Sequence, residues 1–343
     1  MEGSVADELR VALDDAEARE SCLVPSTTAV RNRLDHLTRR GELARVQSSA
    51  YARAAHWDGL DAARRAMCRI RALATLHPDW VFCGASAALV HGLSVSYRSA
   101  SRIEVATRKE APCRSTRNVG RHVIGRDERT VVAGVRVSTL ERTVYDCLRR
   151  LDFRGGLALA DSALRVTGKP REWLTSLFAA PHKGARGIKH ARVAASYADG
   201  RAESGGESIA RGAMIELGFM LPELQVEVPD PLEPWHGYRV DFAWAALDGA
   251  TVFGEFDGRE KYRNPRMTQG RDAVDIFADE RLRESRISAQ GARILRFSFA
   301  DLLDDQRFSR LLVAYGVPRV GDPGRIELRP GHRDWQPSDD GSR

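Results

Sequence analysis

RVDFAW at residues 239–244 and TVFGEFDG at residues 251–258 are short apolar stretches that each carry acidic residues. Their length and composition predict two buried strands. Side chains alternate between the two faces of a strand, so Glu255 and Asp257 share one face, opposite Val252 and Phe256. Asp241 lies between apolar neighbours in the first stretch. A carboxylate that is buried without a partner destabilises a fold strongly, so these acids need a partner.

A divalent cation is one such partner. Oxygen ligands suit Mg²⁺ or Mn²⁺, so Asp241, Glu255 and Asp257 form a predicted metal site. Lys261 follows four positions after Asp257 and would stabilise developing negative charge. Carboxylates that hold a cation beside a lysine are the groups needed to activate water against a phosphodiester. The alternative is structural: Asp241 caps a strand end, and the other two acids line a solvated edge.

The composition is that of a soluble globular protein. The chain has 343 residues, 43% of them hydrophobic and 29% charged, with a net charge of +6. This length predicts two or three domains. No apolar run is long enough to span a bilayer, and no secretory signal precedes the first predicted helix, so we expect a cytoplasmic protein without membrane contacts. The five cysteines include no Cys-x-x-Cys pair and are expected to be core residues.

The first 56 residues predict a winged helix-turn-helix. An acidic helix at 5–20 precedes a basic helix that is capped at 26–28 and ended by Gly41, and a hairpin follows at 43–51. Helices of this kind read base edges while arginines contact phosphates. The predicted base-edge residues are Arg31, Asn32 and Arg33, and the predicted phosphate contacts are Arg39, Arg40 and Arg45. The alternative is a small helical bundle with a solvated arginine face.

The middle of the chain alternates helices and short strands. Predicted helices lie at 60–77 and from 138, and predicted strands begin at 81 and span 102–107, 118–123 and 131–137. Residues 150–200 read as mostly helical, and the Gly- and Ser-rich stretch 199–206 is predicted to be a linker.

Residues 20 to about 150 resemble the AbiEi family, the antitoxins of type IV abortive-infection toxin–antitoxin systems. The matching stretches are GELARV at 41–46 with Tyr51, GASAALVHGL at 84–93 and ERTVYD at 141–146. The resemblance implies a winged helix that binds promoter DNA, an antitoxin domain, and a nucleotidyltransferase-like toxin as partner. The chain has SSAY at 48–51 where the family usually has Arg-Gly-Val-Tyr, so the predicted wing tip lacks an arginine and a glycine.

The last third predicts the order helix, three strands, helix, strand, helix. This order, over about 205–305, resembles the restriction-endonuclease-like PD-(D/E)xK superfamily, and most nearly the domains related to very-short-patch repair (Vsr) endonucleases. The residues that match the family's site are Glu207 in the first helix, Gln225 in the first strand, Asp241, Glu255 and Asp257. Two positions depart from the pattern: Asp257 stands where the superfamily has a lysine, and Lys261 where the nearer branch often has a histidine.

We therefore expect an α+β, multidomain protein. The predicted parts are a winged helix-turn-helix at 1–56, an antitoxin-like α/β domain at 57–200, a restriction-endonuclease-like α/β domain at 201–316 and a disordered tail at 317–343. The expected function is a Mg²⁺-dependent DNA endonuclease with a DNA-binding module, acting in phage defence. Its predicted phosphate contacts are Arg263, Arg266, Arg271, Arg281 and Arg283. The alternatives are a transcriptional repressor and antitoxin with a non-catalytic nuclease-like domain, or a scaffold that neutralises a toxin.

Overall fold

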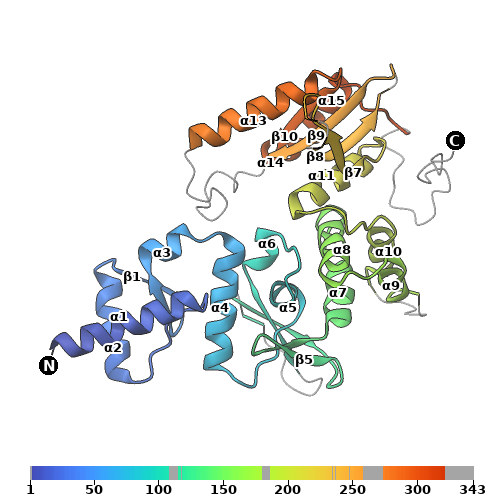
Figure 1. Ribbon diagram of the computed structural model, residues 1–343. Coiled ribbons are helices and arrows are strands. Elements are labelled where there is room, and N and C mark those ends of the chain that lie inside the picture. Colours follow the sequence, from blue (N-terminus) through green and yellow to red (C-terminus); the bar gives the residue numbers. More distant parts are fainter. Residues whose placement is uncertain are drawn as a thin grey trace. The chain divides into compact units, whose positions relative to one another are not determined.

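The computed structural model describes residues 2–107, 115–116, 118–179, 186–233, 235, 237–246, 248–257 and 273–320 (Figure 1). The chain is a mixed α+β protein with three small two-stranded pairings and one four-stranded sheet in the described ranges. It divides into two compact units, Met1–Cys147 and Leu148–Arg343. The domain boundaries at 56/57 and 200/201 stay predictions. Within the described ranges, no helix has both the length and the apolar character needed to cross a membrane.

Unit 1 begins with helices and a hairpin. The elements are α1 (Glu2–Ala18), α2 (Thr28–Arg39), β1 (Leu43–Gln47), β2 (Ala50–Arg53) and α3 (Ala54–Gly59). Thr27 caps α2 by accepting a hydrogen bond from the Val30 N–H, and Gly41 ends it at a φ of 77°. A buried cluster of Leu13, Leu34, Leu43 and Tyr51 joins α1, α2 and the hairpin. The predicted helix and hairpin are confirmed as elements.

The rest of unit 1 packs helices against short strands. Its elements are α4 (Ala62–Leu76), α5 (Gly84–Val90), α6 (Tyr97–Ala100), β3 (Ile103–Thr107), β4 (Val119–Val123), β5 (Arg129–Val132), β6 (Val135–Ser138) and α7 (Leu140–Leu148). The single strand predicted at 131–137 is wrong, because Ala133 and Gly134 adopt φ values of 46° and 77° and turn the chain into the β5–β6 hairpin. The strand predicted from 81 is reduced to bridges made by Phe82.

Unit 2 opens with four helices: α8 (Phe153–Thr167), α9 (Arg171–Ser176), α10 (Ile188–Ser196) and α11 (Gly205–Glu216). α8 and α11 are joined by an ion pair in which Arg211 donates to Asp161 at 2.7 Å, with 4% and 0% of the two side chains exposed. Burial raises the pKa of Asp161, and the charge of Arg211 opposes this. The predicted linker at 199–206 is wrong, since Ala202 is fully buried in the core and α11 begins within the stretch.

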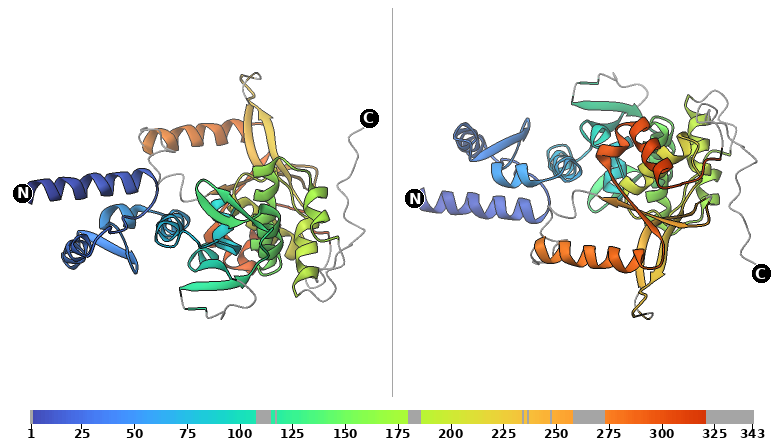
Figure 2. Two further views of the ribbon diagram at one scale, coloured as in Figure 1. Left: turned by 90° about the horizontal axis from the view of Figure 1, so that it is seen from below. Right: turned by 90° about the horizontal axis from the view of Figure 1, so that it is seen from above.

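The four-stranded sheet follows in the order β10-β9-β8-β7. Its strands are β7 (Glu223–Pro229), β8 (Gly237–Ala245), β9 (Thr251–Asp257) and β10 (Arg293–Ser298), and the helices are α13 (Ala273–Ser288), α14 (Phe299–Leu302) and α15 (Asp305–Ala314). β7, β8 and β9 are antiparallel neighbours, whereas β10 runs parallel to β9 after the long connection that contains α13. Figure 2 shows α13 as one uninterrupted helix from two directions. Within the described ranges the predicted order of elements is confirmed, except that the single helix predicted from 301 is two helices, α14 and α15.

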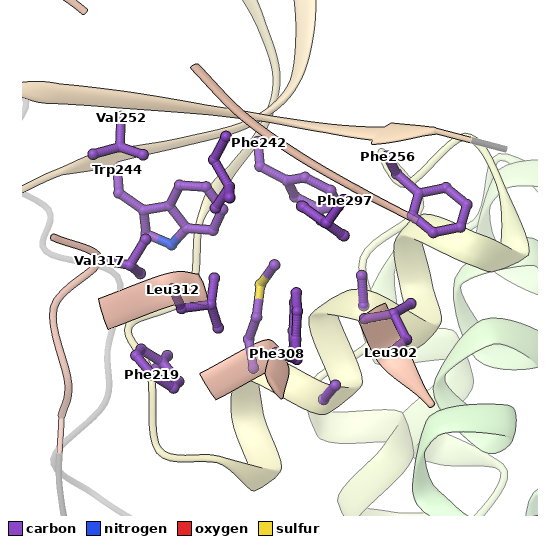
Figure 3. Packing of buried hydrophobic residues seen from close by; sticks show 14 of the residues in the cluster. Phe219, Phe242, Trp244, Val252, Phe256, Phe297, Leu302, Phe308, Leu312 and Val317 are labelled. Atoms are coloured by element: carbon purple, nitrogen blue, oxygen red, sulfur yellow. The ribbon is translucent and has the colours of Figure 1, made fainter. Parts of the chain in front are cut away.

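Two separate apolar clusters cover the two faces of this sheet. Phe242, Trp244, Val252, Phe256 and Phe297 pack on one face with residues of α11 and α15 (Figure 3). On the other face, Phe253 and Val240 pack with Ile287 of α13. The opposite orientation of Val252 and Phe253 confirms the predicted alternation in β9. Gly254 leaves room for the aromatic rings, since a Cβ there would lie 2.8 Å from the Trp244 ring.

The end of the described chain belongs to this fold. Val317 is 4% exposed and lies in the core cluster, and backbone hydrogen bonds join Met220 to Pro318 and Val320 to Gly218. The prediction that disorder begins at 317 is therefore wrong for residues 317–320. The remainder of the predicted tail lies outside the described residues.

Candidate active site and nucleic-acid interface

The strands β8 and β9 stop pairing next to the predicted site. Their register runs from Ala245 opposite Thr251 to Phe242 opposite Gly254. Beyond that pair, the carboxylate of Asp241 accepts a hydrogen bond from the Phe256 N–H at 2.9 Å. The side chain of Asp241 therefore replaces a backbone acceptor at the point where the two strands separate.

The neighbouring strand β7 is irregular at the same level. Leu224 pairs with Phe242 and Val226 with Val240, but Gln225 adopts a φ of 56°, which is uncommon for a residue with a side chain. Leu224 belongs to the cluster under α11, whereas Val226 belongs to the cluster under α13. The side chains of Leu224 and Val226 therefore lie on opposite faces of the sheet, although they are two positions apart, and the change occurs at Gln225. Strain of this kind often lies near a functional site.

Glu207 of α11 approaches this irregularity. Its carboxylate accepts hydrogen bonds from the Gln225 side-chain amide at 3.0 Å and from the Glu203 N–H at 2.8 Å. Its own N–H is capped by the Ser204 hydroxyl. Burial, followed by the negative charge of Asp241, raises the pKa of Glu207. The carboxylates of Glu207 and Asp241 are thus near enough to interact electrostatically, and neither forms an ion pair with an Arg, Lys or His within the described part of the chain.

Glu255 has a different environment. It is 9% exposed, and its two carboxylate oxygens accept from Arg283 of α13 at 2.6 Å and from Arg296 of β10 at 3.1 Å. Arg296 also lies 3.9 Å from Asp257 and 3.7 Å from Glu280. Burial lowers the pKa of Arg296, but these carboxylates outweigh it and the pKa is raised. Glu255 and Asp257 therefore belong to an ion-pair cluster centred on Arg296.

The predicted metal ligands differ in the partners that they have in the structure. Asp241 lies with Glu207, while Glu255 and Asp257 lie with arginines. Across the described ranges, no three His, Cys, Asp or Glu side chains form a group that could hold a metal ion. The shared site of Asp241, Glu255 and Asp257 stays a prediction, and the residues present do not by themselves complete it.

Several predicted residues of this region lie outside the described residues: Lys261, Arg263, Arg266 and Arg271. Arg283, predicted to contact phosphates, is instead held by Glu255 and donates to the backbone carbonyl of Arg239. Sequence reasoning missed the role of Arg296. Its only signal was its place on the strand predicted at 292–299, because the register that sets Arg296 beside Glu255 appears only in the folded sheet.

The predicted DNA contacts come from α2, from Arg40 directly after it and from Arg45 on β1. Arg31, Asn32 and Arg33 of α2 are exposed, and the next residue, Leu34, is buried. Arg40 pairs with Glu42 at 2.8 Å. Arg45 donates to the Ser48 carbonyl at 2.6 Å and lies 3.8 Å from Asp35, whose carboxylate accepts from the Tyr51 hydroxyl. Arg39 is exposed and bonds weakly to the Asp35 carbonyl.

Comparisons with known proteins give relatives but no function. No family model matches the chain. The chain is similar to the uncharacterized proteins MT2308 and Rv2248 of Mycobacterium tuberculosis, from strains CDC 1551 / Oshkosh and ATCC 25618 / H37Rv. Identity to each is 36% over 168 residues, which cover 45% of this chain and 59% of the relative. The chain thus spans less than two thirds of the length of these relatives.

Proposed function

We propose that this chain is a DNA-binding protein of the repressor and antitoxin type that reads DNA with α2. The observation that carries the proposal is the exposed trio Arg31, Asn32 and Arg33 on a helix followed directly by a β-hairpin. Arginine and asparagine side chains can form paired hydrogen bonds with guanine and adenine edges in the major groove. The resemblance of residues 20 to about 150 to AbiEi antitoxins supports the same function and suggests a nucleotidyltransferase-like toxin as partner.

The arrangement of arginines divides their expected roles. Arg40 and Arg45 are held by Glu42 and by groups near the hairpin, so moving them to a phosphate means breaking existing contacts. Arg31 and Arg33 have no ion pair within the described residues. These two arginines are therefore expected to dominate binding.

The test is DNA affinity measured by fluorescence anisotropy on the DNA upstream of the protein's own coding region. We expect the variant Arg31→Ala/Arg33→Ala to bind at least ~10-fold more weakly, since a lost base contact costs about 1–3 kcal/mol. If the variant also loses contacts to phosphates, the slope of log affinity against log salt concentration should become shallower by about 0.9 for each lost contact.

The matched control is Arg10→Ala/Arg19→Ala, with Arg10 on α1 and Arg19 just after its end. Both arginines are exposed and paired with acids of α1, so the control removes the same charge elsewhere in unit 1. Equal affinity of the α2 variant and the wild type would reject the proposal. Equal weakening in both double variants would show that only net charge matters, which also rejects a reading helix.

A second candidate function is a cation-dependent endonuclease in the C-terminal unit. It is favoured by the carboxylate pair of Glu207 and Asp241, because two facing acids without a described cationic partner are stabilised by a bound cation. These two residues would hold Mg²⁺ or Mn²⁺, which would supply positive charge to a phosphodiester oxygen. The Vsr-like resemblance supports this candidate, whereas the arginines on Glu255 favour a nuclease-like domain that does not cut.

Nicking of supercoiled plasmid with MgCl₂ or MnCl₂ separates these outcomes. Asp241→Asn keeps an oxygen that can accept from the Phe256 N–H but removes the charge, so a nuclease should lose its activity while remaining folded. Asp248→Asn, on the exposed turn between β8 and β9, is the matched control. Full nicking by both Asp241→Asn and Glu207→Gln would exclude this site.

A further inference from the structure

Two cysteines of unit 1 lie in one small buried cluster. Cys22 is 5% exposed on the extended segment before α2, and Cys68 is 2% exposed on α4. The cluster also contains Ala50 of β2 and Ala72 of α4. Both cysteines are free thiols, and their side chains belong to the same buried cluster. The fold therefore brings together two thiols that are 46 positions apart in the sequence.

The surroundings make the two thiols unequal. Interaction with Cys22 lowers the pKa of Cys68, and burial and the charge of Glu20 oppose this only in part. Interaction with Cys68 and burial raise the pKa of Cys22. Arg69 has a buried Nε without a hydrogen-bond partner in the described structure. Cys68 is thus the better nucleophile, and Cys22 is placed to react next.

We propose that Cys22 and Cys68 are a redox-active pair that forms a reversible disulfide when the protein meets a peroxide. The Cys68 thiolate attacks one peroxide oxygen, the O–O bond breaks, and a sulfenic acid forms as hydroxide leaves and takes up a proton. The Cys22 sulfur then attacks the Cys68 sulfur, the S–O bond breaks, and a second water leaves with the Cys22 proton. Two thiols are oxidised by two electrons and one peroxide is reduced to two waters.

The location of the pair gives the disulfide a structural effect. The loop that it closes contains α2, β1, β2 and α3. Leu23, next to Cys22, exchanges two backbone hydrogen bonds with Tyr51 of β2, so the cysteine is held on the edge of the hairpin. The disulfide therefore ties the segment that leads into α2 to α4. Closing a loop of this length restricts the unfolded chain and raises stability.

The test uses the full chain with Cys113→Ser, because Cys113 lies outside the described residues. The protein is treated with increasing hydrogen peroxide, quenched, denatured with an alkylating reagent and mapped by peptide mass spectrometry without reductant. We expect a single Cys22–Cys68 cross-link, reversal by dithiothreitol, and a higher unfolding temperature for the oxidised form.

Cys83 and Cys147 are the internal controls, since both are cysteines buried in the same unit. At peroxide concentrations that already link Cys22 to Cys68, the thiols of Cys83 and Cys147 should remain unoxidised and should still be alkylated after the quench. Cys22→Ala should abolish the rise in unfolding temperature and leave Cys68 to oxidise further to the sulfinic acid. Retention of all four thiols over the whole titration, or a cross-link to Cys83 or Cys147, would overturn the proposal.

Discussion

Asp241 of β8 and Phe256 of β9 are joined by a side chain instead of by the sheet: the Asp241 carboxylate accepts from the Phe256 N–H at 2.9 Å. Burial, and after it the charge of the same carboxylate, raises the pKa of Glu207, so one acid both ends the pairing of two strands and interacts with a second acid. Asp241 therefore both accepts a hydrogen bond that ends the strand pairing and carries a negative charge next to Glu207, and variants are needed that change one role without the other.

Asp241→Ala removes the acceptor of a partly buried N–H. We expect the free energy of unfolding to fall by about 1–3 kcal/mol, whereas Asp241→Asn should lose less because an oxygen remains. Urea denaturation followed by circular dichroism measures both. Asp248→Ala on the exposed turn should change stability less than Asp241→Ala does, because solvent screens its ion pair with Arg293. An Asp241→Ala protein as stable as wild type would contradict this hydrogen bond.

Glu207→Gln should stabilise the metal-free protein at neutral pH. The folded-state pKa of Glu207 is raised, first by burial and then by Asp241, so its favourable contribution is complete below the unfolded pKa and is lost as pH rises through the folded pKa. The unfolding temperature of the variant should therefore exceed that of wild type increasingly above about pH 4. Thermal unfolding in a chelator across this range measures the difference, and the exposed Glu172→Gln on α9 is the control.

Asp230→Asn should weaken the hairpin between β7 and β8 in a pH-dependent way. Asp230 is buried and accepts from the Tyr238 hydroxyl at 2.5 Å and from Arg286 at 2.6 Å. The hydrogen bond from Tyr238 is the largest cause of its lowered pKa, so its contribution is present above the unfolded pKa and is lost as pH falls through the folded pKa.

The variant should thus have a lower unfolding temperature at pH 7, and the gap should narrow below about pH 4. Glu233→Gln, exposed in the same loop, should leave the pH profile of stability unchanged. A gap that is constant with pH would mean that the charge of Asp230 does not contribute.

A fragment that begins at residue 201 should fold poorly. It lacks α8 and Asp161, so Arg211 would remain buried without its partner, at a cost of about 3–5 kcal/mol. A fragment of residues 148–343 retains the pair and should unfold cooperatively. Comparing the two by thermal unfolding also tests the predicted boundary at 200/201, and a stable 201–343 fragment would support that boundary.

Thr27→Ala should lower stability by about 1 kcal/mol through loss of the cap of α2. Thr28→Ala, the first residue inside the helix, is the matched control and should have little effect. Chemical denaturation of the two variants measures the difference. Equal loss in both would assign the effect to side-chain packing instead of capping.

Much of the fold could be predicted from local patterns. The alternation in 251–257 gave β9 and the orientation of its side chains, and the Thr27 cap with Gly41 bounded α2. The predictions failed where a signal was weak or misleading. Alanine rarely adopts a positive φ, so the turn at Ala133 between β5 and β6 was missed. Gly205 and Gly206 suggested a linker, although they begin a buried helix.

The candidate site could be predicted only in part. Asp241, Glu207 and Gln225 were found by motif, and they do lie close together. The arginines on Glu255 come from α13 and β10, which are separated from it by about 30 to 40 positions, and no local pattern reveals such partners. The partners of Glu255 are therefore set by the register of β10, which places Arg296 opposite it, and not by its local sequence.

The buried bond between Asp161 and Arg211 also limits how this chain can diverge. A change at either position alone would strand a charge in a dry interior, so in related chains the two are expected to vary jointly or stay fixed. We therefore expect a chimaera that takes α8 from one related chain and α11 from another to lose stability unless both sources carry this pair.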